Sequence, residues 1–168
     1  MNKLKKPCAR RESNRAGALI GMILLVTLQV ILWCVIGIPL GIFHFLRGAV
    51  PLMPRWLYML LDLAIHALLG MAIGAALCNR KYACEIQKYR GAFYFLLAIL
   101  FGYLYYAFFF GISFFLVSFV LAIMELMGLL VASLNFLHVT KSSALFSFVG
   151  CLWALYRVFL AFFAFFCF

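Results

Sequence analysis

The sequence predicts an all-α integral membrane protein, built as a bundle of five transmembrane helices. Hydrophobic residues make up 69% of its 168 residues and charged residues only 11%, which is far more apolar than a soluble domain. Apolar stretches of about 20 residues, enough to cross a hydrocarbon core of about 30 Å, recur along the chain. We therefore expect a basic tail, 1–15, followed by one transmembrane domain, 16–168.

Each expected span is an apolar run of membrane-crossing length, and the five runs lie at about 17–38, 57–78, 91–111, 114–136 and 143–167. The first run is longer than the core of a typical signal peptide and no small-residue cleavage site follows it, so we interpret it as a retained anchor. The third and fourth runs form one stretch with a single charge, Glu125, and "FFGIS" at 109–113 is its expected reversal.

The distribution of Lys and Arg predicts the orientation. Six lie in the tail, 1–15, and four lie in the loop 79–90. Because cytoplasmic loops carry the excess of positive charge, we expect a cytoplasmic N-terminus and a C-terminus on the outer side. A bacterial cytoplasmic membrane is the expected location. The net charge of +10 reflects this asymmetry and attraction to anionic membrane lipids; nucleic-acid binding is not expected, because no folded basic domain carries the charge.

No motif in the chain predicts an enzyme or a metal centre. The six cysteines are scattered without a C-x-x-C pair, so neither a disulfide framework nor a zinc site is supported. The sequence has no nucleophile elbow, zinc-protease motif or phosphate loop. We expect no required cofactor.

Two polar residues in the second span need an explanation. Asp62 and His66 lie four residues apart within an apolar run, so their side chains share one face of a helix. An acid at the centre of a membrane costs about 2.5–3.5 kcal/mol, and such residues usually face a bundle interior or a cavity. The pair could lock helices together, with or without Arg157, or it could face a ligand.

The remaining intramembrane charges, Glu125 and Arg157, raise the same alternatives. They could pair with each other or with Asp62, or Arg157 could hold an anionic group of a ligand with its planar fork. The hydroxyls of Tyr103, Tyr105 and Tyr106 also need partners. These tyrosines could line a pocket for a flat apolar molecule or form hydrogen bonds between helices.

Small residues spaced four apart in the third span predict a helix–helix seam. They are Ala98, Gly102, Ala107 and Gly111. Small side chains let helix backbones approach closely in membranes. We expect a homodimer through this seam.

The order of these features resembles the TspO/MBR family, the tryptophan-rich sensory or translocator proteins. The family's second-span pattern falls without a gap on Pro54, Trp56, Tyr58, Leu69, Gly70 and Ala72, and its "FFG" falls on 109–111. The resemblance places a family tryptophan on Asp62, a family tyrosine on His66, another tryptophan on Tyr105, and a further tryptophan on Trp153. It covers about residues 18–160.

The resemblance implies a five-helix receptor or sensor, commonly dimeric, that binds porphyrin, haem or sterol-like molecules in a cavity between helices. The implied ligand-binding residues are Trp56, Tyr58, Asp62, His66, Tyr105, Tyr106, Phe109, Trp153 and Arg157. His66 could give an axial nitrogen to haem. Porphyrin breakdown by some members depends on cavity tryptophans, one of which is Asp62 here, so we do not carry that activity over.

Two other classes stay open at this point. The first is a substrate-binding membrane subunit of a vitamin importer, which usually has six spans and both termini on one side. The second is a structural membrane protein without a small-molecule ligand.

Overall fold

The computed structural model describes residues 6–36, 54–79 and 85–167. Its elements are the helices α1 (Lys6–Ile36), α3 (Arg55–Leu77), α4 (Glu85–Tyr106), α5 (Phe115–Leu137) and α6 (Lys141–Cys167), with a π-helix, η3 (Ala107–Ile112), continuing α4. Over these residues, five helical segments are long and apolar enough to cross a membrane. The expected fold class, an all-α five-helix bundle, is confirmed.

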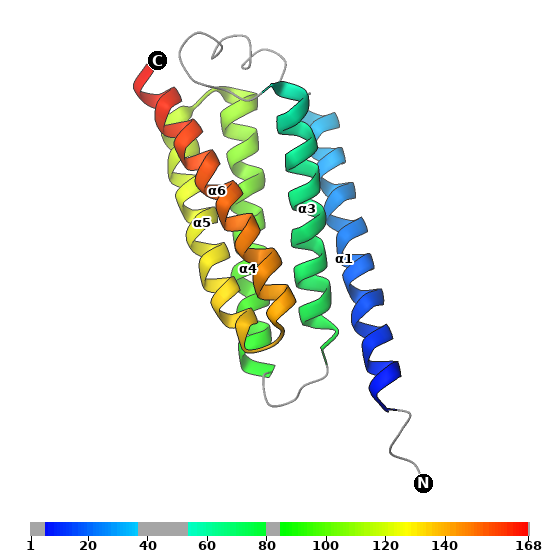
Figure 1. Cartoon of the computed structure of the whole chain (residues 1–168). Coiled ribbons are helices and arrows are strands. Elements are labelled where there is room, and N and C mark those ends of the chain that lie inside the picture. Colours follow the sequence, from blue (N-terminus) through cyan, green and yellow to red (C-terminus); the bar gives the residue numbers. More distant parts are fainter. Residues whose placement is uncertain (1–5, 37–53, 80–84, 168) are drawn as a thin grey trace.

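The helices lie side by side along one common direction (Figure 1). α3 packs against α1 on one side and α6 on the other, and α5 lies between α6 and α4. α3 and α4 also touch, which closes a four-helix core, and α1 covers α3 from outside. The interior that α3, α4, α5 and α6 surround is where buried polar residues can meet.

The two connections that the structure describes are tight reversals. η3 ends at Ile112, and the next residue, Ser113, has a φ of 59°, in the left-handed region. The Phe114 N–H donates to the Phe108 carbonyl at 3.0 Å. This turn lies within the "FFGIS" segment predicted to reverse. Before α6, the Thr140 hydroxyl accepts the Ser143 N–H at 3.2 Å, as a side chain that caps a helix N-terminus does.

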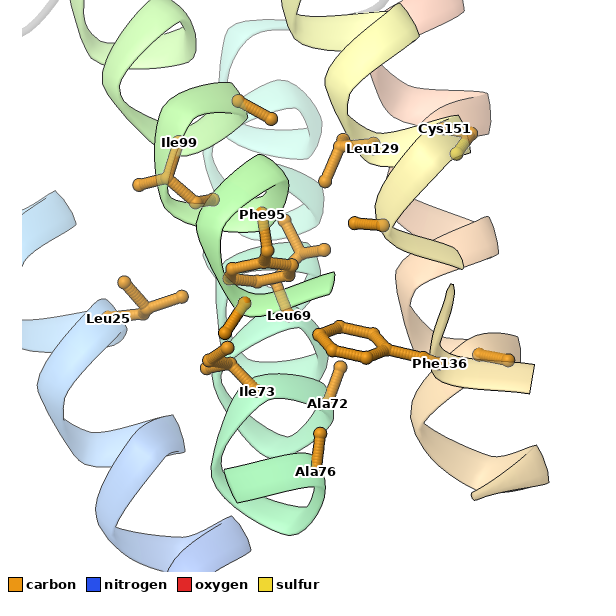
Figure 2. Close-up of a cluster of buried hydrophobic side chains, with 14 of the residues drawn as sticks. Leu25, Leu69, Ala72, Ile73, Ala76, Phe95, Ile99, Leu129, Phe136 and Cys151 are labelled. Carbon is orange, nitrogen blue, oxygen red and sulfur yellow. The ribbon is translucent and has the colours of Figure 1, made fainter. Parts of the chain in front are cut away.

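The apolar core in the half of the bundle where α1 begins draws on all five helices. Leu25, Leu69, Phe95, Leu129 and Cys151 come from α1, α3, α4, α5 and α6 in turn and are buried together (Figure 2). The rings of Phe95 and Phe136 meet at 6.0 Å between centroids. This half is therefore packed mainly by apolar side chains, and the buried charged residues Asp62, Glu125 and Arg157 lie further along the helices.

α1 and α3 touch through glycines on both helices. A Cβ built on Gly21 would lie 2.1 Å from the Gly70 carbonyl oxygen, and one built on Gly74 would lie 2.0 Å from the Gly17 carbonyl oxygen. These distances are too short for any other residue, so the two backbones are in direct contact. Such an approach of small residues is a common way for membrane helices to associate.

Candidate functional site

Asp62 and His66 both point into the bundle. Asp62 has no exposed surface and His66 is 3% exposed, although α3 borders the outside of the bundle along its other face. Their spacing of one turn places them together on one face of α3, where Asp62 bonds to residues of α6 and His66 stacks on Tyr103 of α4. Both side chains therefore face the interior of the bundle, one of the two positions expected for polar residues within a span.

The Asp62 carboxylate accepts hydrogen bonds from two other helices. From α1, Gln29 Nε2 donates to Oδ2 at 2.5 Å. From α6, Trp153 Nε1 donates to Oδ1 at 2.9 Å and Arg157 Nη2 donates to the same oxygen at 2.7 Å. Both oxygens therefore have protein partners, and this one side chain joins α1, α3 and α6.

Arg157 also pairs with the second buried acid. Its Nη1 donates to Glu125 Oε1 at 2.9 Å and to Oε2 at 3.1 Å. Arg157 is 1% exposed and Glu125 is 3% exposed. The pairing that the sequence left open is thus resolved, because Arg157 bridges Asp62 and Glu125. We call these three residues the ion cluster.

Gly102 makes room for the ion cluster on α4. A Cβ at this position would lie 2.7 Å from Glu125 Oε1 and 3.1 Å from Arg157 Nη1. A side chain there would push the α4 backbone away from the ion pair. Gly102 therefore serves packing inside the chain.

His66 is held by its own helix. Its Nδ1 lies 2.8 Å from the Asp62 carbonyl oxygen and 3.6 Å from Asp62 Oδ1. The imidazole stacks on the Tyr103 ring with 6.0 Å between centroids. No group of three His, Cys, Asp or Glu side chains that could hold a metal ion occurs among the described residues. A bond from His66 to haem iron stays a prediction.

Aromatic side chains gather beside the ion cluster. The Tyr58 and Trp153 rings lie 5.0 Å apart, and the Trp153 and Tyr156 rings stack at 5.3 Å. Tyr105 stacks on Phe109 at 5.2 Å. These five residues, which we call the aromatic cluster, come from α3, α4, η3 and α6.

The ion and aromatic clusters are in direct contact. The guanidinium carbon of Arg157 lies 5.4 Å from the Tyr105 ring centroid and 5.9 Å from that of Trp153, within the range of a cation–π interaction. The Arg157 Nε and the Tyr105 hydroxyl are buried and have no hydrogen-bond partner within the described part of the chain. Such groups are rare in native proteins and call for an explanation.

Of the nine predicted ligand-binding residues, eight are buried and one is not. Tyr58, Asp62, His66, Tyr105, Tyr106, Phe109, Trp153 and Arg157 are at most 5% exposed. Trp56 lies in the first turn of α3 and is 67% exposed. Trp56 therefore lies outside the buried group, because position 56 is on a different face of α3 from Tyr58; its contact with a ligand stays a prediction.

Sequence reasoning missed two site residues, Gln29 and Tyr156. Tyr156 stacks on Trp153. Gln29 is fully buried and donates to Asp62. A signal was present, since Gln29 is an amide in the middle of the first apolar run, and polar residues within a span usually have an interior partner.

Half of the predicted dimer seam is used inside the chain. Ala98 and Gly102 are both buried. Ala98 packs against Gly128 of α5, where an added Cβ would lie 2.9 Å from Ala98 Cβ, and Gly102 faces the ion cluster. The prediction that these two residues meet a second copy is wrong for that reason. Ala107 and Gly111 lie further along, and Gly111 is exposed; dimerisation itself stays a prediction.

A groove on the outer surface lies apart from both clusters. It runs between the start of α4 and the end of α5 and is lined by Ile86, Tyr89, Arg90, Phe93, Tyr94, Val131 and Asn135. Ile86 and Phe93 are largely exposed, so this groove faces the surroundings of the bundle and not its interior.

Together these features define a class, a membrane-embedded five-helix protein with a buried ion cluster against a buried aromatic cluster. Comparison of the chain with known proteins found no matching family, no matching curated protein and no matching solved structure.

Proposed function

We propose that this protein is a membrane receptor or sensor of the TspO/MBR type, which binds a flat hydrophobic molecule of the tetrapyrrole class beside Arg157. One observation carries the proposal. Residues that the resemblance assigns to the ligand come from three distant stretches of the chain, near 58–66, 105–109 and 153–157, and eight of them are buried in one region of the bundle interior. Sterol-like molecules are the second ligand class that the resemblance implies.

The chemistry of this region suits a tetrapyrrole with acidic substituents. Tyr58, Tyr105 and Trp153 offer ring faces for a flat apolar molecule. The unpaired Arg157 Nε and Tyr105 hydroxyl offer donors to a carboxylate. Asp62 acts on the ligand indirectly in this proposal, because its oxygens already accept three hydrogen bonds. It holds Arg157 in position, and no catalytic step is proposed.

A guest in this region must displace aromatic side chains. Tyr58, Tyr105 and Phe109 have no exposed surface, so binding requires their rings to move apart. This is a shift toward a more open state that the ligand stabilises. We expect the emission of Trp153 to change on binding for that reason.

Removing the Tyr105 hydroxyl is expected to weaken binding without weakening the fold. In Tyr105→Phe, the affinity for protoporphyrin in lipid nanodiscs should fall about tenfold, the loss of one hydrogen bond worth about 1.4 kcal/mol. The thermal stability of the ligand-free protein should be unchanged or higher, because an unpaired buried hydroxyl is removed. Fluorescence titration and thermal unfolding measure the two quantities.

The matched control is Tyr89→Phe, which removes a hydroxyl from an exposed tyrosine of the same helix. It should bind as the wild type does. Equal affinity of all three proteins would remove the aromatic cluster as the ligand site. No binding of protoporphyrin, haem or sterol by the wild type would favour a structural membrane protein.

The proposed location is a bacterial cytoplasmic membrane, with the N-terminus in the cytoplasm and the C-terminus outside. The helical order agrees with ends on opposite sides, because α1 begins at one end of the bundle and α6 finishes at the other (Figure 1). Labelling of single cysteines added at each terminus, from either side of the membrane, tests this orientation. Both termini on one side would favour the vitamin-importer subunit instead.

A further inference from the structure

The ion cluster contains one more acid than base. Asp62 and Glu125 face the single guanidinium of Arg157. If both carboxylates were ionised beside a neutral His66, the buried cluster would carry one net negative charge. An uncompensated charge in the interior of a membrane protein is costly. A proton bound to one acid would remove it.

The hydrogen bonds distinguish the two acids. Both Asp62 oxygens accept N–H donors, three in total, and a proton on either oxygen would oppose one of these donors. Glu125 is bonded through the single nitrogen Nη1 of Arg157. One Glu125 oxygen can therefore carry a proton while the other still accepts from Arg157.

The surroundings of Glu125 supply no second cation from the described residues. The charged side chains that act on it are Arg157 from α6 and Asp62 from α3. Tyr105 from α4 and Cys151 from α6 also lie within its electrostatic reach, and both are neutral weak acids near pH 7. From α1 the cluster receives the neutral amide of Gln29, and His66 from α3 acts on Asp62 and Arg157.

We propose that Glu125 is a proton-binding site, which holds one exchangeable proton in the folded protein and so keeps the ion cluster electrically neutral. The ligand is H⁺, taken up from water by the carboxylate to give the carboxylic acid. This proposal does not rest on the hydrophobic ligand proposed above, because it is argued from the ligand-free cluster alone. It makes the stability of the bundle depend on pH.

The sign of this dependence follows from linkage. A glutamate exposed on unfolding is ionised above about pH 4.3, whereas the folded protein keeps the proton. Unfolding then releases one proton, so stability falls as the pH rises, by about tenfold in the unfolding constant per pH unit. The slope ends at the pH where Glu125 loses its proton in the folded protein as well.

The test compares the unfolding free energies of two carboxylate-to-amide variants and the wild type in detergent, from about pH 4.3 up to the pH where the slope ends. Glu125→Gln imitates the protonated acid and should match the wild type at the acidic end and lose the pH dependence. Asp62→Asn replaces the acid that accepts three donors and should be less stable at every pH. An equal loss of stability in both variants would overturn the assignment.

Infrared spectroscopy of the wild type gives a second readout that does not need a folded variant. Near neutral pH, where exposed carboxyl groups are ionised, the proposal requires one carbonyl band of a protonated carboxyl, absent from Glu125→Gln if that variant folds. Absence of this band in the wild type contradicts the proposal. So does a pH dependence that persists in Glu125→Gln and disappears in His66→Gln, since the proton would then reside on the imidazole.

Discussion

Replacing Asp62 with alanine is expected to destabilise the folded bundle by about 3 kcal/mol or more. The substitution leaves the Arg157 Nη2, the Trp153 Nε1 and the Gln29 Nε2 without their acceptor. Removing one member of a buried ion pair typically costs about 3–5 kcal/mol, because the other charge stays buried and unpaired. Reversible unfolding by denaturing detergent in mixed micelles measures the loss.

The matched control is Glu85→Ala, which removes an exposed carboxylate at the start of α4. An exposed acid in the first turn of a helix is worth only about 0.3–1 kcal/mol, so its unfolding midpoint should stay near that of the wild type. A loss in Asp62→Ala no larger than in this control would mean that the ion cluster does not hold the helices together.

Replacing Gly21 with leucine is expected to separate α1 from α3 and cost about 3 kcal/mol. The added Cβ would lie 2.1 Å from the Gly70 oxygen and 3.0 Å from the Gly70 carbonyl carbon. These are backbone atoms, so no side chain can turn aside and the helices must move apart. Overpacking typically costs about 1–3 kcal/mol, and the movement would also draw Gln29 away from Asp62. The free energy of unfolding in detergent measures this loss.

Gly111→Leu is the control for a glycine on the surface. Among the described residues, a Cβ there meets only Ile36 Cγ2 at 3.5 Å, an ordinary contact, and Gly111 is exposed. We expect a change below about 1 kcal/mol. If both glycine variants lost equal stability, α1 would not be held on α3 by backbone contact.

The sequence predicted the helices well because hydropathy and length decide them. The five spans, the reversal after "FFG" and the inward position of Asp62 and His66 depend on patterns within one helix. When one face of an apolar membrane helix carries the polar residues, that face is expected to point into the bundle. This prediction does not require knowing which helix packs against it.

Partners between helices could not be predicted in the same way. Spacing shows that Ala98 and Gly102 share a face, but it does not show whether that face meets α5 or a second copy. The rotation of α1 that brings Gln29 to Asp62 follows from the glycines of both helices together. Likewise, Trp56 and Tyr58 are two residues apart, and only the packed bundle separates the exposed ring from the buried one.

Asp62 and Arg157 are bonded to each other inside the bundle, and this bond joins α3 to α6. A double-mutant cycle with Asp62→Asn, Arg157→Gln and the double variant, measured as unfolding free energies, tests whether the two residues stabilise the fold as a pair. The short bond between Arg157 Nη2 and Asp62 Oδ1, at 2.7 Å, predicts a coupling energy of about 1.5–3 kcal/mol. Losses that simply add, with a coupling energy below about 0.5 kcal/mol, would contradict it.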